Sequence, residues 1–444
     1  MPSAEHSRAY RAAILYFVGD PLQLGEQAWH FHEDGILWVE QGLVKAVGAA
    51  ADMLERLPRR ISLECFPHHL ITPGFIDCHV HYPQTEMIAA YGERLLSWLN
   101  TYTFPTELKF QDRAYAAQVS EFFLDELLRN GTTTALVFGT VYPESVDALF
   151  QAAQQRNLRM ITGKVMMDRH APQELCDTAQ QSYQDSKMLI ERWHGVDRLQ
   201  YAVSPRFAPC SSQEQLNKAG QLLREHPGVY LHTHLSENQE EVAWVKALFP
   251  QSRHYLDVYE QAGLLTRRSV FAHGIHLCDD ECQRLAATGG AIAHCPTSNL
   301  FLGSGLFPLD KLQQWGVHIG LGTDVGGGTS FSLLRTLDEA YKVQQLQGAS
   351  LDPFQALYLA TLGGARALDL EHTIGSLQPG YEADFCILDL HATPLLAFRM
   401  QHCHTPRDIL FALNTLGDDR AVARTYSLGR CVHQAESKPH ARDK

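Results

Sequence analysis

Residues 110–138 read FQDRAYAAQVSEFFLDELLRNGTTTALVF. Val119, Phe123 and Leu127 recur at a spacing of four residues, which predicts a helix over 110–130 with one apolar face. The apolar and β-branched remainder of the stretch predicts a buried strand directly after that helix. Together they form one helix–strand unit, and similar units recur along most of the chain.

Apolar runs alternate with helical stretches between residues 71 and 368. Eight runs can be identified, at 74–80, 132–138, 160–165, 199–203, 229–234, 270–273, 291–294 and 317–322. About eight strand-then-helix units predict an α/β fold with a (β/α)8 TIM-like barrel. A doubly wound sheet is the alternative. No Gly-x-Gly-x-x-Gly motif follows the first strand, which disfavours its dinucleotide-binding form.

The two ends of the chain differ from this middle region, because short strands and glycine turns replace the helices. Neither end has enough strands to form a stable sheet alone. We therefore expect both ends to combine in one small β-sandwich domain. The predicted boundaries are 1–70 for its N-terminal part, 71–368 for a metal-dependent barrel and 369–444 for its C-terminal part.

Composition and charge narrow the class of protein. The chain has 37 Lys and Arg against 50 Asp and Glu, a net charge of −13, which argues against nucleic-acid binding. No apolar run approaches the ~20 residues of a membrane-spanning helix. The apolar run at 12–19 lacks a small-residue cleavage site, so we expect no signal peptide. The ten cysteines include no Cys-x-x-Cys pair, which favours a cytoplasmic protein with reduced thiols.

Histidines and an aspartate gather at the predicted C-terminal ends of strands, where barrels of this type place their chemistry. His79 and His81 end the first strand two residues apart, so both imidazoles face the same way. His234 ends the fifth strand, and Asp324 follows the eighth. Three imidazoles and a carboxylate suit a divalent ion such as Zn²⁺.

Other polar residues near strand ends each have two interpretations. Glu237 can exchange protons beside a metal, or it can stabilise the start of a helix. Arg206 can donate to a carbonyl group or form a surface ion pair, while the adjacent Phe207 can stack on a flat ring. His273 ends the sixth strand. The sequence does not decide the roles of three more residues, which could serve packing, hydrogen bonding or support of the site: His232, His294 and Lys164.

Several motifs occur together over nearly the whole chain. They are Pro73-Gly-Phe-Ile-Asp-Cys-His-Val-His81, His81-Tyr-Pro-Gln84, Leu95-Leu-Ser-Trp-Leu99, Tyr102-Thr-Phe-Pro105, Asn130-Gly-Thr-Thr-Thr134, Gly163-Lys-Val-Met-Met-Asp168, Ser204-Pro-Arg-Phe207, His234-Leu-Ser-Glu-Asn238, His294-Cys-Pro-Thr-Ser-Asn299, Gly322-Thr-Asp324 and Leu416-Gly-Asp-Asp-Arg420. In these motifs the chain resembles the amidohydrolase superfamily and, within it, the guanine deaminase family.

The resemblance implies zinc-dependent hydrolysis of guanine to xanthine and ammonia. It also implies one Zn²⁺ per chain rather than two, because the fourth strand has no lysine of the kind that bridges two metals in binuclear amidohydrolases. The implied zinc ligands are His79, His81, His234 and Asp324. The implied substrate contacts are Gln84, Trp98, Leu99, Arg206, Phe207, His234 and Glu237, with Trp98 and Leu99 on a covering segment. The implied catalytic groups are Glu237 as the proton shuttle, and His273 and Asp324 as the groups that orient the attacking hydroxide.

The resemblance also implies a cytoplasmic homodimer that acts in purine catabolism or salvage, without nucleic-acid or membrane partners. An amidohydrolase that deaminates another aminated ring, such as an s-triazine, a pterin or an oxidised purine, is the alternative. A non-catalytic relative that keeps the barrel as a scaffold is a further alternative. The complete set of ligands and acid–base groups disfavours that last one.

Overall fold

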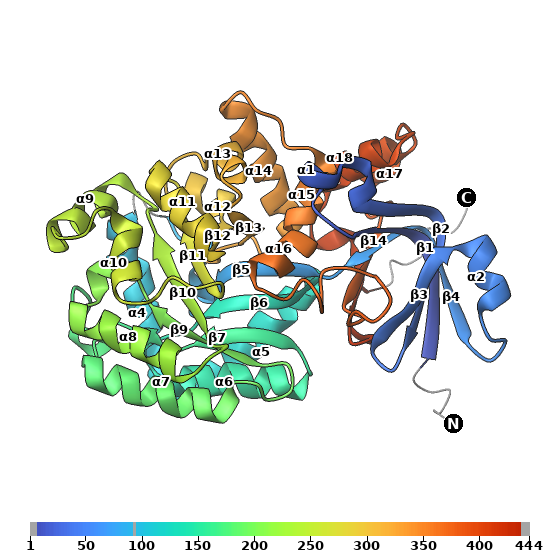
Figure 1. Ribbon diagram of the computed structural model, residues 1–444. Coiled ribbons are helices and arrows are strands. Elements are labelled where there is room, and N and C mark those ends of the chain that lie inside the picture. The colour runs from blue at the N-terminus through green and yellow to red at the C-terminus, as the bar shows by residue number, and fades with distance from the viewer. Residues whose placement is uncertain (1–6, 92–94, 437–444) are drawn as a thin grey trace.

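The computed structural model describes residues 7–91 and 95–436, and these form a helix-covered barrel beside a separate twisted sheet (Figure 1). The first sheet has nine strands and the second has seven. This arrangement confirms the predicted fold class. Within the described residues, no helix combines the length and the apolar character that a bilayer crossing requires.

The barrel consists of parallel strands in the spatial order β13-β12-β11-β10-β9-β7-β6-β5. Their bounds are β5 Phe75–His81, β6 Thr132–Phe138, β7 Arg159–Gly163, β9 Gln200–Pro205, β10 Tyr230–Leu235, β11 Ser269–His273, β12 Ala291–His294 and β13 His318–Leu321. Each of the eight predicted runs overlaps one of these strands. The third run is divided, because the short strand β8, Val165–Met166, also pairs with β9.

Helices cover the outside of the barrel (Figure 1). The principal ones are α5 Arg113–Arg129, α6 Pro143–Gln155, α7 Ala179–Trp193, α8 Gln213–Glu225, α9 Gln239–Leu248, α10 Tyr255–Gln261, α11 Asp279–Thr288, α12 Pro296–Phe301, α13 Leu309–Gln314, α14 Leu333–Leu346, α15 Pro353–Leu359 and α16 Leu362–Ala367. The helix predicted over 110–130 begins later, because the side chain of Asp112 accepts a hydrogen bond from the backbone N–H of Ala114 and caps it there.

A series of short helical turns follows β5 and precedes α5. They are η3 Tyr82–Met87, α3 Leu95–Trp98, η4 Leu99–Thr103, α4 Phe104–Glu107 and η5 Leu108–Gln111. Smaller turns elsewhere in the barrel are η6 Gln173–Leu175 and η7 Ala208–Cys210. The segment after β5 is the one that the resemblance places over the substrate. The side chains of residues 95 and 96 lie outside the described part of the chain.

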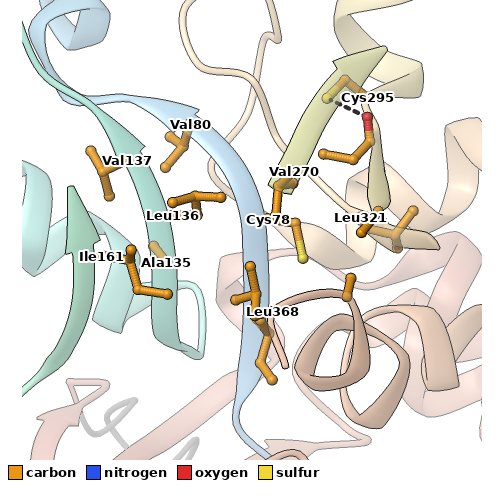
Figure 2. Packing of buried hydrophobic residues seen from close by; sticks show 14 of the residues in the cluster. Cys78, Val80, Ala135, Leu136, Val137, Ile161, Val270, Cys295, Leu321 and Leu368 are labelled. Carbon is orange, nitrogen blue, oxygen red and sulfur yellow. Dashed lines mark hydrogen bonds between the residues drawn. The ribbon is translucent and has the colours of Figure 1, made fainter. Parts of the chain in front are cut away.

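The barrel closes between its first and last strands. Apolar side chains of adjacent strands pack tightly there (Figure 2), and a Cβ added to Gly320 would lie only 2.4 Å from the Sγ of Cys78. Just beyond β13, the backbone N–H of Asp324 donates to the carbonyl oxygen of His79 over 2.8 Å. Asp77 Oδ1 accepts a hydrogen bond from the backbone N–H of Thr323 over 3.0 Å. These contacts hold the strand ends that carry the predicted ligands in fixed positions.

The separate sheet combines strands from both ends of the chain in the order β16-β15-β14-β4-β1-β2-β3. Their bounds are β1 Ser7–Phe17, β2 Trp29–Glu40, β3 Leu43–Ala49, β4 Ser62–Pro73, β14 Phe385–Asp389, β15 Val422–Ser427 and β16 Arg430–Gln434. Its accompanying helices and turns are α1 Pro21–Leu24, η2 Gly25–Ala28, α2 Ala50–Arg56, α17 Pro394–Met400, α18 Pro406–Leu416 and η8 Asp419–Ala421.

Because β4 pairs with β1 on one side and with β14 on the other, the two chain ends share one continuous sheet. The residue limits 1–70, 71–368 and 369–444 remain our proposal for the domain boundaries. Residues 1–6 and 437–444 lie outside the described residues.

A buried ion network joins the sheet to the N-terminal ends of the barrel strands. Arg198, which precedes β9, donates from Nη1 to Glu382 Oε2 and to Asp384 Oδ2, each over 2.7 Å. Its Nη2 bonds to Ser427 Oγ and to the backbone carbonyl of Asn157. The Arg198 side chain is 7% exposed and that of Asp384 is 2% exposed. The barrel and the sheet are therefore joined by paired charges as well as by apolar contacts.

Candidate metal and substrate site

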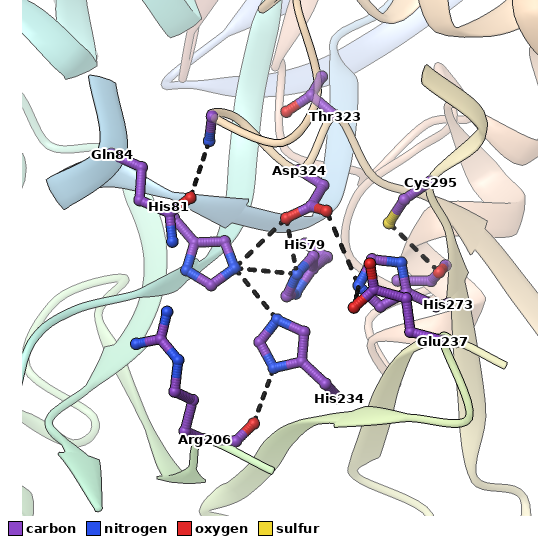
Figure 3. Close-up of polar contacts among 12 residues, drawn as sticks. His79, His81, Gln84, Arg206, His234, Glu237, His273, Cys295, Thr323 and Asp324 are labelled. Carbon is purple, nitrogen blue, oxygen red and sulfur yellow. Dashed lines mark hydrogen bonds and ion pairs between the residues drawn. The ribbon is translucent and has the colours of Figure 1, made fainter. Parts of the chain in front are cut away.

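Four side chains converge at the C-terminal ends of the barrel strands, and together they form a metal site (Figure 3). His81 Nε2 lies 3.2 Å from His79 Nε2 and 3.2 Å from His234 Nε2. Asp324 Oδ1 lies 3.1 Å from His79 Nε2 and 3.3 Å from His81 Nε2. β5 supplies two of these ligands, β10 supplies the third, and the segment after β13 supplies Asp324.

The spacing of these atoms fits a bound ion. Four ligands at about 2.0 Å from a tetrahedral ion lie about 3.3 Å from one another, which is close to the observed separations. His234 Nδ1 lies 2.7 Å from the carbonyl oxygen of Arg206, so Nδ1 carries the proton and Nε2 keeps its lone pair. Burial lowers the pKa of His81 to about 3, which keeps that imidazole neutral and able to bind a cation.

His232 supports this group from behind. Its Nε2 lies 2.7 Å from His79 Nδ1, so it fixes the ring that presents His79 Nε2 to the site. The sequence left the role of His232 open. The structure shows that it contacts the metal-ligating residue His79. Asp324 is charged: burial raises its pKa, but the neighbouring His79 and His81 outweigh burial and hold the pKa well below its usual range.

The backbone turns sharply at the strand ends that form the site. His273, Asp324 and Ser236 have φ values of 72°, 49° and 49°, in the left-handed region that residues other than glycine rarely adopt. Such conformations persist where the surrounding structure holds them, and they are common at functional sites. His273 ends β11, Ser236 follows β10 and Asp324 follows β13 after a short connection, so all three lie at the strand ends that form the site.

A pocket opens beside the four ligands. Every residue predicted to contact the substrate lines it: Gln84, Trp98, Leu99, Arg206, Phe207, His234 and Glu237. His81, His273 and Asp324 also line it, together with Leu302 and Gly327, which the sequence analysis did not single out. Figure 3 shows Gln84 and Arg206 on one side of the ligands and Glu237 and His273 on the other.

The carboxyl group of Glu237 lines the pocket beside the metal ligands. Burial, followed by the nearby negative charge of Asp324, raises the pKa of Glu237 to about 8. Ser304 Oγ donates a hydrogen bond to Glu237 Oε1 over 3.2 Å. Helix α9 is capped by its neighbours instead, because Asn238 and Glu241 form a capping box. The Glu237 side chain is therefore available to a ligand in the pocket.

His273 completes this side of the site. Its Nδ1 lies 2.9 Å from Asn299 Oδ1, which makes Nδ1 the protonated nitrogen and Nε2 the free one. His273 Nε2 lies 3.4 Å from Glu237 Oε2 and 3.7 Å from Asp324 Oδ2. Asn299 was not identified as a functional residue from the sequence. Its position in the motif His294-Cys-Pro-Thr-Ser-Asn299 was the signal that could have identified it.

Comparison with known proteins agrees with this geometry. Residues 70–432 match the model of the amidohydrolase family. The guanine deaminase of Escherichia coli K12 is 52% identical over 98% of this chain and 100% of its own. The chain belongs to the guanine deaminase family of amidohydrolases. It is therefore a hydrolase with a metal site of three histidines and one aspartate.

Solved structures of this family have the same fold. Guanine deaminase from Bradyrhizobium japonicum superposes with a TM-score of 0.94 at 36% identity, over 97% of this chain and 100% of that one. Guanine deaminase from C. acetobutylicum, solved with guanine bound in its active site, gives a TM-score of 0.87 at 27% identity, over 96% and 100% of the two chains.

In this guanine deaminase family member, Arg206 is buried rather than at the surface, so the alternative of a surface ion pair is wrong. Its Nη1 lies 2.9 Å from each carboxylate oxygen of Glu107, and both side chains are almost fully buried. Sequence analysis missed Glu107. The signal was a charged residue two positions after the apolar, proline-containing motif Tyr102-Thr-Phe-Pro105.

The two other open residues do not line the pocket. Lys164 forms a buried ion pair with Asp177 and also donates to Ser182 Oγ over 3.3 Å, so its role is structural. His294 stacks on Phe307 with a centroid separation of 4.2 Å. Both ring nitrogens of His294 are buried without a hydrogen-bond partner, and burial lowers its pKa to about 3.

Proposed function

We propose that this chain catalyses the hydrolytic deamination of guanine to xanthine and ammonia. One observation carries the proposal. A single pocket brings together the metal ligands, a carboxyl group able to exchange a proton, and a guanidinium–amide pair able to recognise the edge of a purine. Family membership supports the same reaction, because full-length relatives such as the E. coli enzyme are guanine deaminases.

The metal that we propose is one Zn²⁺ per chain, held by His79, His81, His234 and Asp324. When bound, Zn²⁺ lowers the pKa of water toward about 7 and so supplies a nucleophile at neutral pH. The neutral imidazoles and the charged carboxylate suit this ion. A second ion is not expected, because strand β9 contains no lysine and Lys164 is paired with Asp177.

Proton transfer falls to Glu237, His273 and Asp324. A carboxyl group with a pKa of about 8 can both accept and return a proton near neutral pH. We assign to Glu237 the transfer of a proton to the ring nitrogen next to C2 as the C–O bond forms there. His273 Nε2 and Asp324 Oδ2 face the same point and orient the attacking oxygen. The remaining proton of the added hydroxyl group then goes to the amino group, the bond between C2 and that nitrogen breaks, and ammonia leaves while C2 becomes a carbonyl carbon.

Recognition of guanine falls to the opposite side of the pocket. Arg206 donates to the 6-oxo group, and Gln84 bonds to the neighbouring edge of the ring. Phe207, Trp98 and Leu99, each less than a tenth exposed, supply apolar surface for the purine faces. Adenine has an amino group at position 6 and would present a donor to the Arg206 donors, so it should be a poor substrate.

An ammonia-release assay over a panel of aminated rings tests the proposal. The panel is guanine, adenine, a pterin, an aminated s-triazine and an oxidised aminopurine. We expect guanine to have the highest kcat/KM. A higher value for another ring would identify the alternative amidohydrolase, and no release from any ring would indicate a non-catalytic scaffold.

We also propose a cytoplasmic homodimer that acts in purine catabolism or salvage. All ten cysteines are free thiols, which supports a reducing compartment. Leu395 and Phe398 of α17 are each 62% exposed, and they are apolar surface that a second copy would cover. Sedimentation velocity should give the mass of two chains, and Phe398→Glu tests this face. Neither a nucleic acid nor a membrane is among the partners that we propose.

A further inference from the structure

Glu107, the last residue of α4, is a buried carboxylate that does not line the pocket but binds Arg206, which does. Its side chain is fully buried, and each of its oxygens lies 2.9 Å from Arg206 Nη1. The guanidinium also lies over the ring of Phe104, with 5.5 Å between Cζ and the ring centroid. The same short helix therefore supplies both a charged and an aromatic contact to Arg206.

Gln84 is the other group that we expect to recognise the purine edge. Its Oε1 accepts a hydrogen bond from the backbone N–H of Gly326 over 3.2 Å. Burial raises the pKa of Glu107, and the neighbouring Arg206 and Gln84 side chains oppose that rise. Glu107 thus orients Arg206 directly and lies next to Gln84.

We propose that Glu107 is a positioning and specificity residue, which makes the pocket select a neutral oxopurine over an anionic one. This inference rests on the proposed function. Arg206 is only 3% exposed, so without Glu107 its positive charge would lie in the pocket wall uncompensated. With Glu107 the pair is neutral. Nη1 is engaged, and the remaining guanidinium N–H groups act as directional donors to a carbonyl oxygen rather than as a cation that attracts anions.

The test compares two ligands that differ in charge. Hypoxanthine is a neutral 6-oxopurine at neutral pH, and urate is an anionic oxopurine. Calorimetry or competition against guanine turnover gives the affinity of each for the metal-loaded protein. In Glu107→Gln we expect hypoxanthine to bind roughly ten- to a hundred-fold more weakly, the range for one lost charge-assisted hydrogen bond. We expect urate to bind more tightly than it does to the wild type.

A matched control is available in the same barrel. Asp177→Asn breaks the buried ion pair with Lys164, which is outside the pocket. A purely structural effect of losing a buried pair would appear in both variants and would weaken both ligands alike. We expect Asp177→Asn to keep the wild-type ratio of hypoxanthine to urate affinity. If it changes that ratio as Glu107→Gln does, or if Glu107→Gln leaves the ratio unchanged, the proposal is wrong.

Glu107→Asp covers the case in which Glu107→Gln does not fold. It keeps the negative charge but shortens its reach, so hypoxanthine should bind more weakly while urate is still rejected. Wild-type affinities for both ligands in this variant would also overturn the proposal. Failure of the proposed function is a separate result, because the wild type would then release no ammonia from guanine. The ratio of hypoxanthine affinity to urate affinity would still test the role of Glu107.

Discussion

At the N-terminal ends of the barrel strands, every strong charge in the network around Arg198 has a partner within the protein. Glu382, Asp384, Ser427 and the carbonyl of Asn157 all contact this one guanidinium. At the C-terminal ends the situation differs. Buried polar atoms there lack any hydrogen-bond partner, and they include His81 Nδ1, His273 Nε2, Ser236 Oγ, Ser298 Oγ and Asn299 Nδ2.

This difference shows two roles of buried polar groups: those around Arg198 stabilise the structure, whereas those at the metal site are available to a ligand. An unpaired buried polar group costs free energy. Thr132 Oγ1 and Gln200 Oε1 are also unpaired near the N-terminal ends, but His273 Nε2 at the C-terminal ends faces a pocket in which a ligand or an ion can pair with it. Paired charges at the opposite end serve to fix one domain on another. The four predictions below test this distinction, in order of decreasing effect.

The largest effect is expected from His81→Ala. Wild-type protein should retain about one zinc equivalent after dialysis, and the variant should lose most of it together with its activity, because one of four ligands is gone. Metal analysis of both preparations measures this. Two tightly held equivalents in the wild type would contradict a mononuclear site.

Glu237→Gln should lower turnover by roughly 10³- to 10⁴-fold, the upper part of the range for general acid–base catalysis. The amide has nearly the same volume but cannot carry the proton, so folding, zinc content and guanine binding should persist. Turnover, metal content and ligand affinity are measured on one preparation. Turnover within tenfold of the wild type would remove Glu237 from this role, while loss of zinc would make it a ligand.

Arg198→Ala should lower the free energy of unfolding by about 3–5 kcal/mol, because Asp384 is left buried without its cation, whereas Glu382 keeps its ion pair with Arg159. Denaturant unfolding measures this. The kcat/KM of the folded fraction should stay within about twofold, since the network lies at the opposite end of the barrel. Lys342→Ala, which removes an exposed pair with Asp338, is the control and should cost about 0.5 kcal/mol or less. A large loss of activity without loss of stability would contradict the purely structural role that we assign to the Arg198 network.

Arg206→Ala should lower kcat/KM for guanine by roughly ten- to a hundred-fold, which corresponds to a lost hydrogen bond of about 1.5–3 kcal/mol. The variant also leaves Glu107 unpaired, so the informative quantity is the ratio of guanine to 2-aminopurine, which lacks the 6-oxo group. The ratio should fall. An equal loss for both substrates would show that Arg206 does not recognise that oxygen.

Much of the fold and the metal site could be predicted from local sequence. The alternation that placed His79 and His81 on one face depends only on strand geometry, and the structure brings both to the site with His234 and Asp324. The periodic apolar face of α5 likewise identified that helix. Its start was predicted three residues early, because Phe110 continues the apolar pattern whereas Asp112 caps the helix.

Contacts between distant segments could not be predicted in this way. Glu107 and Arg206 are 99 residues apart, and nothing local to either one indicates the other. The pairing of His79 with His232 is similar, since the second histidine sits deeper on a different strand. The partners of Arg198 lie in the other domain. In each case the deciding fact is which segments the finished topology places together.

The junction between β5 and β13 also constrains how the molecule can be made. Asp77 and Thr323 are 246 residues apart, and the ligands beside them come from the same two segments. During synthesis Asp324, the fourth metal ligand, therefore meets the other three only after the last barrel strand has left the ribosome. Closing so long a loop is slow compared with forming the local strand–helix units. Zinc loading should thus be a late event that follows barrel closure, and a nascent chain that ends before residue 324 should acquire no tightly held ion.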